Sequence, residues 1–341
     1  MWHRKQGRVY EWHRKASLAL KWLHYSLGRT RNLPNPDRMY LESTNVCNLS
    51  CVMCPSGRNL MSRPKGFMSF DLFRSIVDEM ARRVQVTTLH IWGEPLLHPQ
   101  IFDMIAYCRK AGLHSEISTN ATLLDRQRGR ALISAGVGTV YLCLDGVQKQ
   151  TYEMIRQGAD FEQTRSNIAA FLDLKNSVGR ETPYVNLQII EMRPTMAEID
   201  EFHKQWRLPG VDHINVKAFD SWGNQVEQIT GLGANGHLTP ARRFRCPNLW
   251  YHVHIYWDGM LVSCDRDFDA TYPLGNVSSG VMKAWNGERM ALLRRKHVLS
   301  QLADVPACSN CVEWSWWKPG IFMAHGNAPA ENDGQKTRDA R

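Results

Sequence analysis

The amino-acid sequence predicts an α/β fold, a partial (β/α)6 TIM-like barrel followed by a small cysteine-rich domain of a β-hairpin and helices. Three observations support this prediction. Six short β-branched segments alternate with amphipathic segments between residues 38 and 219, and polar residues follow the strand segments where they end. After about residue 240 the alternation gives way to a hairpin pattern and four cysteines.

Six strands and five helices make up the predicted barrel. Ser69 is the expected N-cap of the first of these helices, and Pro99 is expected in the first turn of the second. Successive βα units predict a parallel sheet, which either curves into an open or partial barrel or lies doubly wound. The predicted strands are 38–44, 87–93, 114–120, 139–146, 184–192 and 213–219, and the predicted helices are 69–83, 99–111, 123–135, 161–175 and 197–206.

Polar groups at the strand ends favour the barrel over the doubly wound sheet. A cysteine cluster follows the first strand, and Gly93-Glu94 follows the second. Thr119-Asn120 comes after the third strand and Asp145 after the fourth. In a (β/α) barrel the carboxyl ends of the strands form the face that carries the active site. We therefore expect these groups to meet on one rim.

A basic amphipathic helix over 8–27 precedes the barrel. We expect its apolar face to cover the barrel, in preference to its basic face lying on an anionic membrane. The side chains expected to pack are Val9, Trp12, Ala16, Leu20, Leu23 and Leu27.

The region after residue 240 is expected to form a second, small domain that a bound metal centre holds together. Residues 252–264 alternate around Asp258-Gly259, which predicts a hairpin, and a helix is expected over 280–296. The predicted division is an N-terminal helix segment 1–37, a barrel 38–238, a cysteine-rich domain 239–326 and a disordered tail 327–341.

Composition limits the classes of protein that this chain can be. No apolar run approaches the ~20 residues that span a bilayer, and the N-terminus lacks a secretion signal. We therefore expect a cytoplasmic protein whose nine cysteines are ligands or free thiols. The formal charge of +9 admits an anionic partner, and a solvated basic surface is the simpler interpretation.

Cys47, Cys51 and Cys54 lie within eight residues, at gaps of three and two. An odd number of thiols cannot pair off into disulfides, and a tetrahedral zinc site needs a fourth ligand. A cubane 4Fe–4S cluster held by three cysteines leaves one iron with an open position. The spacing therefore indicates an iron–sulfur site at which a further ligand can bind.

The segment CNLSCVMCP resembles the CxxxCxxC motif of the radical S-adenosylmethionine (SAM) superfamily. WGEP (92–95), STN (118–120), CLDG (143–146) and YEMIRQG (152–158) resemble further family segments, so the resemblance extends to about residue 220. It implies a SAM-binding 4Fe–4S cluster on Cys47, Cys51 and Cys54. It also implies SAM contacts, with Met53 in place of the usual aromatic residue and Cys143 in place of a frequent serine. The implied SAM-binding residues are Met53, Gly93, Glu94, Thr119, Asn120, Cys143, Asp145 and Arg156.

The C-terminal region resembles the SPASM/twitch extensions of this superfamily. The order of Cys246, Gly259-x4-Cys264, LGNV (274–277) and Cys308-x2-Cys311 carries this resemblance. Four cysteines imply one fully ligated auxiliary 4Fe–4S cluster, and a structural zinc is the alternative. Cys108 and Cys143 are left over as ordinary buried residues.

The resemblance implies reductive cleavage of SAM to a 5′-deoxyadenosyl radical, which takes hydrogen from a substrate C–H bond. We expect an oxidoreductase that performs a two-electron oxidation (a dehydrogenation) of a small polar, sugar-like substrate, aided by the auxiliary cluster. Modification of a ribosomally made peptide by crosslinking or oxidation is the alternative, and flavodoxin or ferredoxin would supply electrons. A base is also expected, with Glu191, Arg193, Asp220 and Asp265 as candidates.

Two hypotheses from other classes explain less. A zinc-bound nucleic-acid module would suit the charge and the CxxC pair, but it leaves the cysteine triplet and the rim residues without a role. A catalytically silent scaffold would not need the intact cysteines and Glu94. We therefore expect no nucleic-acid partner.

Overall fold

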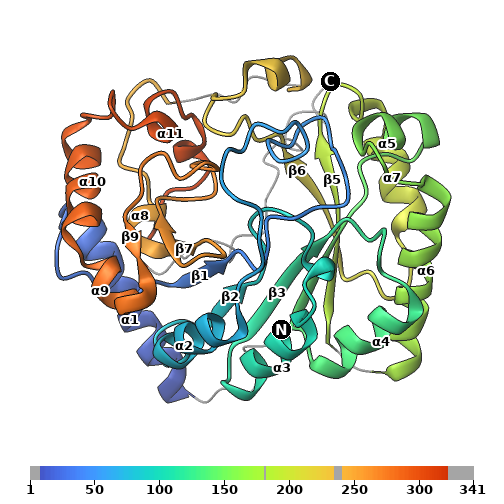
Figure 1. Ribbon diagram of the computed structural model, residues 1–341, viewed down its shortest axis with the longest axis horizontal. Coiled ribbons are helices and arrows are strands. Elements are labelled where there is room, and N and C mark those ends of the chain that lie inside the picture. The colour runs from blue at the N-terminus through green and yellow to red at the C-terminus, as the bar shows by residue number, and fades with distance from the viewer. Residues whose placement is uncertain (1–7, 180–181, 234–239, 322–341) are drawn as a thin grey trace, which may run out of the picture.

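A computed structural model describes residues 8–179, 182–233 and 240–321 of the chain, and the expected tail 327–341 lies outside them. Figure 1 shows a curved sheet with helices around it. The predicted α/β fold with a largely parallel sheet is confirmed. None of the described helices is long and apolar enough to cross a membrane.

Each of the six predicted strands is present, and the six lie side by side in sequence order, all parallel. On its other side the first strand pairs with a strand of the C-terminal region (His252–Ile255) instead of with the sixth strand. The sixth strand is therefore at one end of the sheet, which stays open as a partial barrel. The strands are β1 (Arg38–Leu41), β2 (Val86–Thr88), β3 (His114–Thr119), β4 (Thr139–Cys143), β5 (Tyr184–Glu191) and β6 (His213–Ala218).

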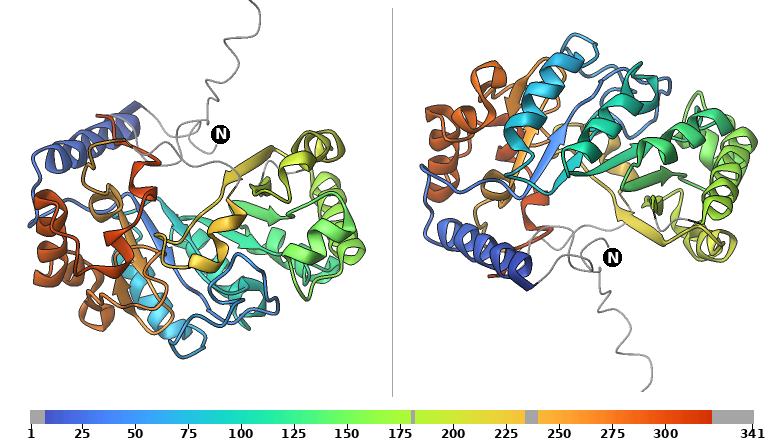
Figure 2. Two further views of the ribbon diagram at one scale, coloured as in Figure 1. Left: turned by 90° about the horizontal axis from the view of Figure 1, so that it is seen from above. Right: turned by 90° about the horizontal axis from the view of Figure 1, so that it is seen from below.

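Helices cover the outside of this sheet (Figure 2). Ser69 caps the first of them, because its hydroxyl accepts a hydrogen bond from the backbone N–H of Leu72. Pro99 lies just before its expected helix, which begins at Ile101 with Gln100 as its N-cap, and a short 3-10 turn over Pro95–Leu97 comes earlier. The helices are α2 (Phe70–Met80), α3 (Ile101–Lys110), α4 (Arg126–Ala135), α5 (Lys149–Ile155), α6 (Phe161–Val178) and α7 (Ile199–Trp206).

The predicted hairpin is present, and it extends the barrel sheet. β7 (His252–Ile255) and β8 (Met260–Val262) are antiparallel, with Gly259 at φ +83° in the turn. β7 also pairs in parallel with β1, and β9 (Gly275–Asn276) completes a nine-stranded sheet. The hairpin thereby supplies hydrogen-bond partners to the edge that β1 would otherwise expose.

The helix expected over 280–296 is two helices, α9 (Val281–Trp285) and α10 (Glu288–Leu299). The break falls at Asn286-Gly287, where the Asn286 side chain accepts a hydrogen bond from the backbone N–H of Leu33. Two single-turn helices, α8 (Asn248–Tyr251) and α11 (Pro306–Ser309), flank this region.

α1 (Arg8–Ser26) is present, but the prediction of its packing face is wrong. Leu18, Lys21 and Tyr25 are buried, whereas Trp12, Ala16, Leu20, Leu23 and Leu27 face solvent. The buried face is selected by specific partners. Tyr25 donates a hydrogen bond to the Arg245 carbonyl, and the Lys21 ammonium pairs with Asp37 at 3.2 Å.

Candidate active site

A cavity of about 440 Å³ opens at the carboxyl ends of the barrel strands. Its lining brings together the polar groups predicted to follow the first four strands, namely the cysteine triplet, Gly93-Glu94, Thr119-Asn120 and Asp145. The parallel strands place these ends on one rim, as a barrel requires.

The cysteine loop lies between β1 and α2 and is tightly folded. The backbone N–H of Cys54 donates to the Cys51 carbonyl at 3.1 Å. A Cβ added at Gly57 would lie 2.6 Å from the Cys51 nitrogen, so this return of the chain requires glycine. The backbone N–H groups of Ser50 and Val52 donate to carbonyls at the end of α5, which anchors the loop to the barrel.

Cys47, Cys51 and Cys54 all line the cavity, and their charges interact with one another. Burial raises the pKa of Cys47 to about 11 and that of Cys54 to about 12, so bare thiolates are unfavourable here. Thiolate ligands would need compensating positive charge, which iron supplies. As they stand, no three His, Cys, Asp or Glu side chains of the described chain could hold a metal ion. The three thiols thus share one cavity without surrounding a single ion, and their chemistry fits a larger cluster.

Glu94 ties the ends of β2 and β3 together. Its carboxylate accepts hydrogen bonds from the backbone N–H groups of Leu96 (3.0 Å) and Asn120 (2.8 Å). The Thr119 hydroxyl donates a third at 2.8 Å. Burial raises the pKa of Glu94, and these donors oppose that rise. The side chain predicted to contact SAM therefore also holds the rim in shape.

Gly93 brings this segment against the cysteine loop. It adopts φ +76°, and a Cβ there would lie 2.6 Å from the Thr44 carbonyl and 2.7 Å from the Val46 carbonyl. The backbone N–H of Glu94 donates to the Val46 carbonyl at 2.8 Å. Only glycine allows the two loops to approach this closely.

Asp145 and Arg156 form a buried ion pair beside the thiols. The Arg156 guanidinium meets Asp145 at 2.6 and 2.8 Å, and its third nitrogen lies 3.9 Å from Cys51 Sγ. The Asn120 amide similarly lies 4.0 Å from Cys47 Sγ. These donors stabilise negative charge on the sulfurs.

Met53 and Cys143 lie near the same site. Met53 is buried, and its carbonyl accepts a hydrogen bond from the Trp222 indole at 2.8 Å. The expectation that Cys143 is an ordinary buried residue is wrong, because it is only partly buried and lines the cavity, with its sulfur 3.1 Å from the Ser118 hydroxyl. The other leftover thiol, Cys108, is buried in the hydrophobic core.

Sequence reasoning missed the polar inner face of the sheet. Arg38 on β1 and Glu116 on β3 form a buried ion pair of 2.5 Å, and Tyr40 and Tyr141 interact with both charges. His90 Nδ1 accepts from the backbone N–H of Ser118, so in the neutral ring Nε2 carries the proton. The inner-face residues that line the cavity are Arg38, Tyr40, Thr88, His90, Glu116, Ser118, Tyr141, Cys143, Gln188, Asn215 and Lys217.

The missed signal is the alternation of polar residues within the strand segments. Buried parallel strands are usually apolar on both sides. Here every second residue of segments such as Arg38-Met39-Tyr40 and Asn215-Val216-Lys217 is polar. This period of two indicates that one face of the sheet borders a cavity.

The structure places only one of the four candidate bases at the cavity. Asp220 lines it, whereas the described lining lacks Glu191, Arg193 and Asp265. Burial raises the pKa of Asp220 to about 7, against the opposing effect of Arg266. Arg193 is exposed and donates to the Gly233 carbonyl. Burial acts to raise the pKa of Asp265, but Arg266, His254 and Lys217 together lower it.

The four later cysteines form a second group, and the cavity lining of the described chain contains none of them. They are Cys246, Cys264, Cys308 and Cys311. The charge of Cys246 interacts with each of the other three thiols, and Cys264 also interacts with Cys308. Burial raises the pKa of all four. As they stand, these side chains do not surround a single ion either. Four thiols in one neighbourhood have the ligand chemistry of a fully ligated 4Fe–4S cluster, and zinc is the alternative left open by the sequence.

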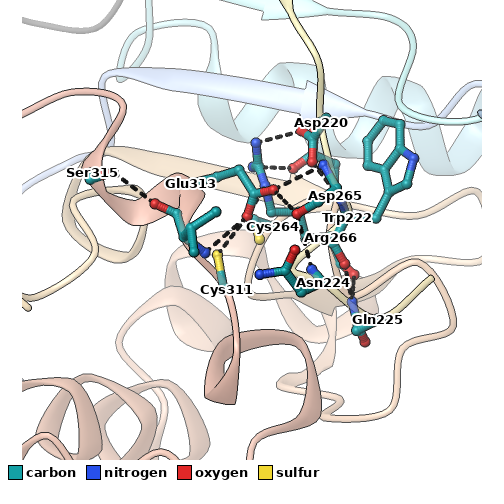
Figure 3. Close-up of polar contacts among 12 residues, drawn as sticks. Asp220, Trp222, Asn224, Gln225, Cys264, Asp265, Arg266, Cys311, Glu313 and Ser315 are labelled. Atoms are coloured by element: carbon teal, nitrogen blue, oxygen red, sulfur yellow. Dashed lines mark hydrogen bonds and ion pairs between the residues drawn. The ribbon is translucent and has the colours of Figure 1, made fainter. Parts of the chain in front are cut away.

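Arg266 links this second site to the cavity (Figure 3). Its guanidinium lies 2.6 Å from Asp220 and 3.6 Å from Glu313. Cys311 Sγ lies 3.1 Å from the Glu313 carboxylate, which also accepts hydrogen bonds from the backbone and hydroxyl of Ser221. One arginine thus connects a cavity-lining carboxylate with a group that touches the second cysteine site.

Two family models match the chain. Residues 41–199 match the radical SAM superfamily, and residues 246–312 match the SPASM iron–sulfur cluster-binding domain. The first match contains the cysteine triplet, and the second contains the four later cysteines. Both domains imply 4Fe–4S clusters.

Among curated proteins, the chain is similar to a "Tungsten-containing aldehyde ferredoxin oxidoreductase cofactor-modifying protein" of Pyrococcus furiosus. The two are 28% identical over 313 residues, which cover 80% of this chain and 86% of the relative. A "PqqA peptide cyclase" of Rhodopseudomonas palustris is 26% identical over 159 residues, but these cover only 46% of this chain and 42% of the relative.

Solved structures share the fold at low sequence identity. BtrN, solved with AdoMet and 2-DOIA, aligns with a TM-score of 0.56 and 14% identity over 82% of this chain and 94% of its own. SuiB of Streptococcus suis, solved with S-adenosylmethionine, aligns with a TM-score of 0.61 and 14% identity over 80% of this chain and 71% of its own.

Proposed function

Because this chain belongs to the radical SAM superfamily and carries a SPASM domain, we propose that it oxidises a small polar substrate by two electrons. The observation that carries the proposal is the joint lining of one cavity by three thiols and a polar inner face of the sheet. In this proposal the predicted barrel segment 38–238 contains the active site, and the predicted segment 239–326 is the domain that binds the auxiliary cluster.

Cys47, Cys51 and Cys54 would hold the SAM-binding 4Fe–4S cluster. The proposed SAM site beside them is surrounded by the residues that the family resemblance implied, namely Met53, Gly93, Glu94, Thr119, Asn120, Cys143, Asp145 and Arg156. When bound, this cluster and SAM supply a 5′-deoxyadenosyl radical that removes a hydrogen atom from an unactivated C–H bond. The residues of the chain position the reactants and exclude water. The Arg156–Asp145 pair and Glu94 hold the rim rigid around the thiols, which fixes the distance at which a substrate can approach.

The inner face favours a substrate rich in hydroxyl or similar groups. The charges of Arg38 and Glu116 satisfy each other, as do those of Arg156 and Asp145. The other inner-face groups that line the cavity include the neutral donors and acceptors of Tyr40, Tyr141, Gln188, Asn215 and the His90 ring. The Lys217 side chain lies beside them and can donate further hydrogen bonds to a hydroxyl-rich substrate. Burial lowers the pKa of His90 to about 3, which keeps that ring neutral.

We assign the base to Asp220. It alone among the four candidates lines the cavity of the described chain, and its pKa near 7 suits proton transfer at neutral pH. Its carboxylate is held by Arg266 at 2.6 Å and by the backbone N–H of Trp222 at 2.8 Å. Asp220 would take the proton that a hydroxyl loses as the substrate becomes a carbonyl. The second electron would leave to an auxiliary 4Fe–4S cluster on Cys246, Cys264, Cys308 and Cys311.

Modification of a ribosomally made peptide is the second candidate function. A relative named a peptide cyclase supports it, although that relative matches less than half of this chain. The relative matched over most of both chains is named for modifying a cofactor, which supports a small-molecule substrate. An electron donor such as flavodoxin or ferredoxin is part of either proposal.

Anaerobic turnover tests the proposal. The cluster-reconstituted chain is reduced with dithionite and mixed with SAM, and 5′-deoxyadenosine is measured by liquid chromatography. Perdeuterated myo-inositol and perdeuterated amino sugars serve as probes of the polar class. Transfer of deuterium to 5′-deoxyadenosine with formation of a ketone supports the proposal. Absence of 5′-deoxyadenosine under all conditions contradicts it, and transfer only from ribosomal precursor peptides establishes the second candidate instead.

A further inference from the structure

The outer face of α1 exposes an apolar stripe, which we define as Trp12, Ala16, Leu20, Leu23 and Leu27. These residues are three or four positions apart, so they lie on one side of the helix over about 22 Å. The backbone N–H of Leu27 donates to the Leu23 carbonyl, which continues the helical turn. The large side chains of the stripe are 75% (Trp12), 47% (Leu20), 45% (Leu23) and 61% (Leu27) exposed.

The opposite face of α1 attaches the helix to the protein. Leu18 is 2% exposed, and Tyr25 packs edge-on against Trp250 with ring centroids 5.6 Å apart. Arg245 donates to the Tyr25 carbonyl at 2.6 Å, and Lys21 pairs with Asp37. The helix is therefore fixed with its outer stripe pointing away from the core, and the stripe has no role in holding the fold together.

A second exposed apolar group continues this surface on α10. In the three views, α1 runs beside the C-terminal helices (Figures 1 and 2). A Cβ at Gly28 would lie 3.2 Å from the Val298 side chain, so the end of α1 touches the end of α10. Leu292, Val298 and Leu299 on α10 are themselves exposed. The exposed Val298 thus adjoins the end of α1, and contiguous exposed apolar groups mark interaction surfaces.

Positive charge is concentrated in the same part of the chain. Residues 1–36 contain eight Lys and Arg side chains and one acidic residue, Glu11, which is a formal charge of +7 out of the +9 of the whole chain. Residues 12–36 contain no acidic residue. Lys15 and Arg29 are both exposed; Lys15 precedes Ala16 on the helix and Arg29 follows Leu27 by two residues. The remaining 305 residues are nearly neutral, so the cationic region is specific to this segment.

We propose that the outer stripe of α1 docks this protein onto an anionic phospholipid surface. An amphipathic helix with Trp and Leu on one face and cations beside them lies in the membrane interface, and it does so without spanning the membrane. Each cation near such a surface strengthens binding by about five-fold. A second copy of the chain fits less well, because a two-fold pairing of the stripes would bring the same cations toward each other.

Co-sedimentation with vesicles tests this proposal independently of the catalytic function. The cluster-loaded full chain is mixed with phosphatidylcholine vesicles prepared with and without phosphatidylglycerol. We expect binding only when phosphatidylglycerol is present, and loss of that binding at about 0.5 M salt, where charges are screened within a few ångströms. The variant Leu20→Gln/Leu23→Gln/Leu27→Gln should bind at least about ten-fold more weakly. Lys15→Gln/Arg29→Gln should weaken binding by about twenty-fold at low salt.

Leu208→Gln is the matched control, because Leu208 is 43% exposed but lies in the turn after α7. It should bind as the unaltered chain does, and circular dichroism should show unchanged helix content in every variant. Failure of the unaltered chain to bind phosphatidylglycerol vesicles overturns the proposal. So does equal binding by the triple variant. Self-association in light scattering that the triple variant abolishes, without vesicle binding, would identify the stripe as an interface between copies and also overturn it.

Discussion

The two cysteine sites use the same ligand chemistry in opposite surroundings. Cys47, Cys51 and Cys54 come from one loop of eight residues, and all three line the main cavity. The four later cysteines come from three segments between residues 246 and 311, and the described cavity lining contains none of them. Three thiolates leave a cubane one open iron, whereas four leave none. The first site can therefore bind a reactant, and the second is suited to holding an electron.

Their connections to the rest of the chain also differ. The first loop is held by backbone contacts with the ends of neighbouring strands, including the close approach at Gly93. The second site is held by side chains, since Glu313 contacts Cys311 and Arg266 reaches from Glu313 to Asp220. The three ligands of the first site are sequence neighbours, whereas those of the second site come together only once distant segments have packed.

The largest effect is expected from Cys51→Ala, which removes a ligand of the open site. SAM cleavage should become undetectable, and iron should fall from about eight to about four atoms per chain, because the auxiliary cluster keeps its ligands. Chromatography of 5′-deoxyadenosine and an iron assay measure both quantities. Cys108→Ala, at a buried thiol outside both sites, is the control and should retain both. If Cys51→Ala cleaves SAM as fast as the unaltered chain, the assignment of SAM cleavage to the first site is wrong.

Cys264→Ala should separate the two functions. We expect iron to fall to about four atoms per chain while substrate-free cleavage of SAM continues, because the open site is intact. Product formation should be lost, and the melting temperature should fall because the site joins three segments. If Cys264→Ala still forms product and has lost zinc rather than iron, the second site is a structural zinc site with no part in electron transfer.

Asp220→Asn should reduce product formation by about 10²–10⁴-fold, the usual contribution of a general base. In the unaltered chain, product formation should rise as the pH increases through about 7, because burial raises the pKa of Asp220 to that value and only the carboxylate can accept a proton. Arg266→Gln removes a charge that lowers this pKa, so the rise should move to higher pH.

Glu191→Gln is the matched control for Asp220→Asn, since Glu191 is a carboxylate at the end of β5 that lies outside the cavity lining of the described chain. It should retain activity. A flat pH profile in the unaltered chain, or equal losses in the two variants, would remove Asp220 from the mechanism.

The smallest effect is expected from Glu313→Gln, which keeps the shape of the side chain and removes its charge. Partners of metal ligands typically contribute 10–100-fold to metal affinity, so the auxiliary iron should be lost about 10–100-fold more readily to a chelator. Iron at the first site should be unaffected. Glu288→Gln, at an exposed carboxylate on α10, is the control. Equal iron loss from both sites would contradict the independence of the two clusters.

Much of the barrel could be predicted from sequence because its signals are local. The six strands begin at or within one residue of their predicted starts, and the rim residues after them gather at one cavity. The break at Asn286-Gly287 was missed although Asn-Gly is itself a local turn signal. Contacts between distant segments could not be predicted, and they include the pairing of β7 with β1 and the choice of Asp220 among the four base candidates.

The sequence by itself determined the ligand set of the first site, since three cysteines in one short loop need no tertiary contact to be near one another. It also determined which residues of the N-terminal helix are apolar. Only the tertiary structure decided which of them are buried, because a helix with apolar groups on both sides packs the face whose partners are specific. Tyr25 and Lys21 have such partners and Leu18 is buried as they are, whereas Leu20 and Leu23 remain about half exposed. The burial of a side chain is a property of its surroundings as well as of its hydrophobicity.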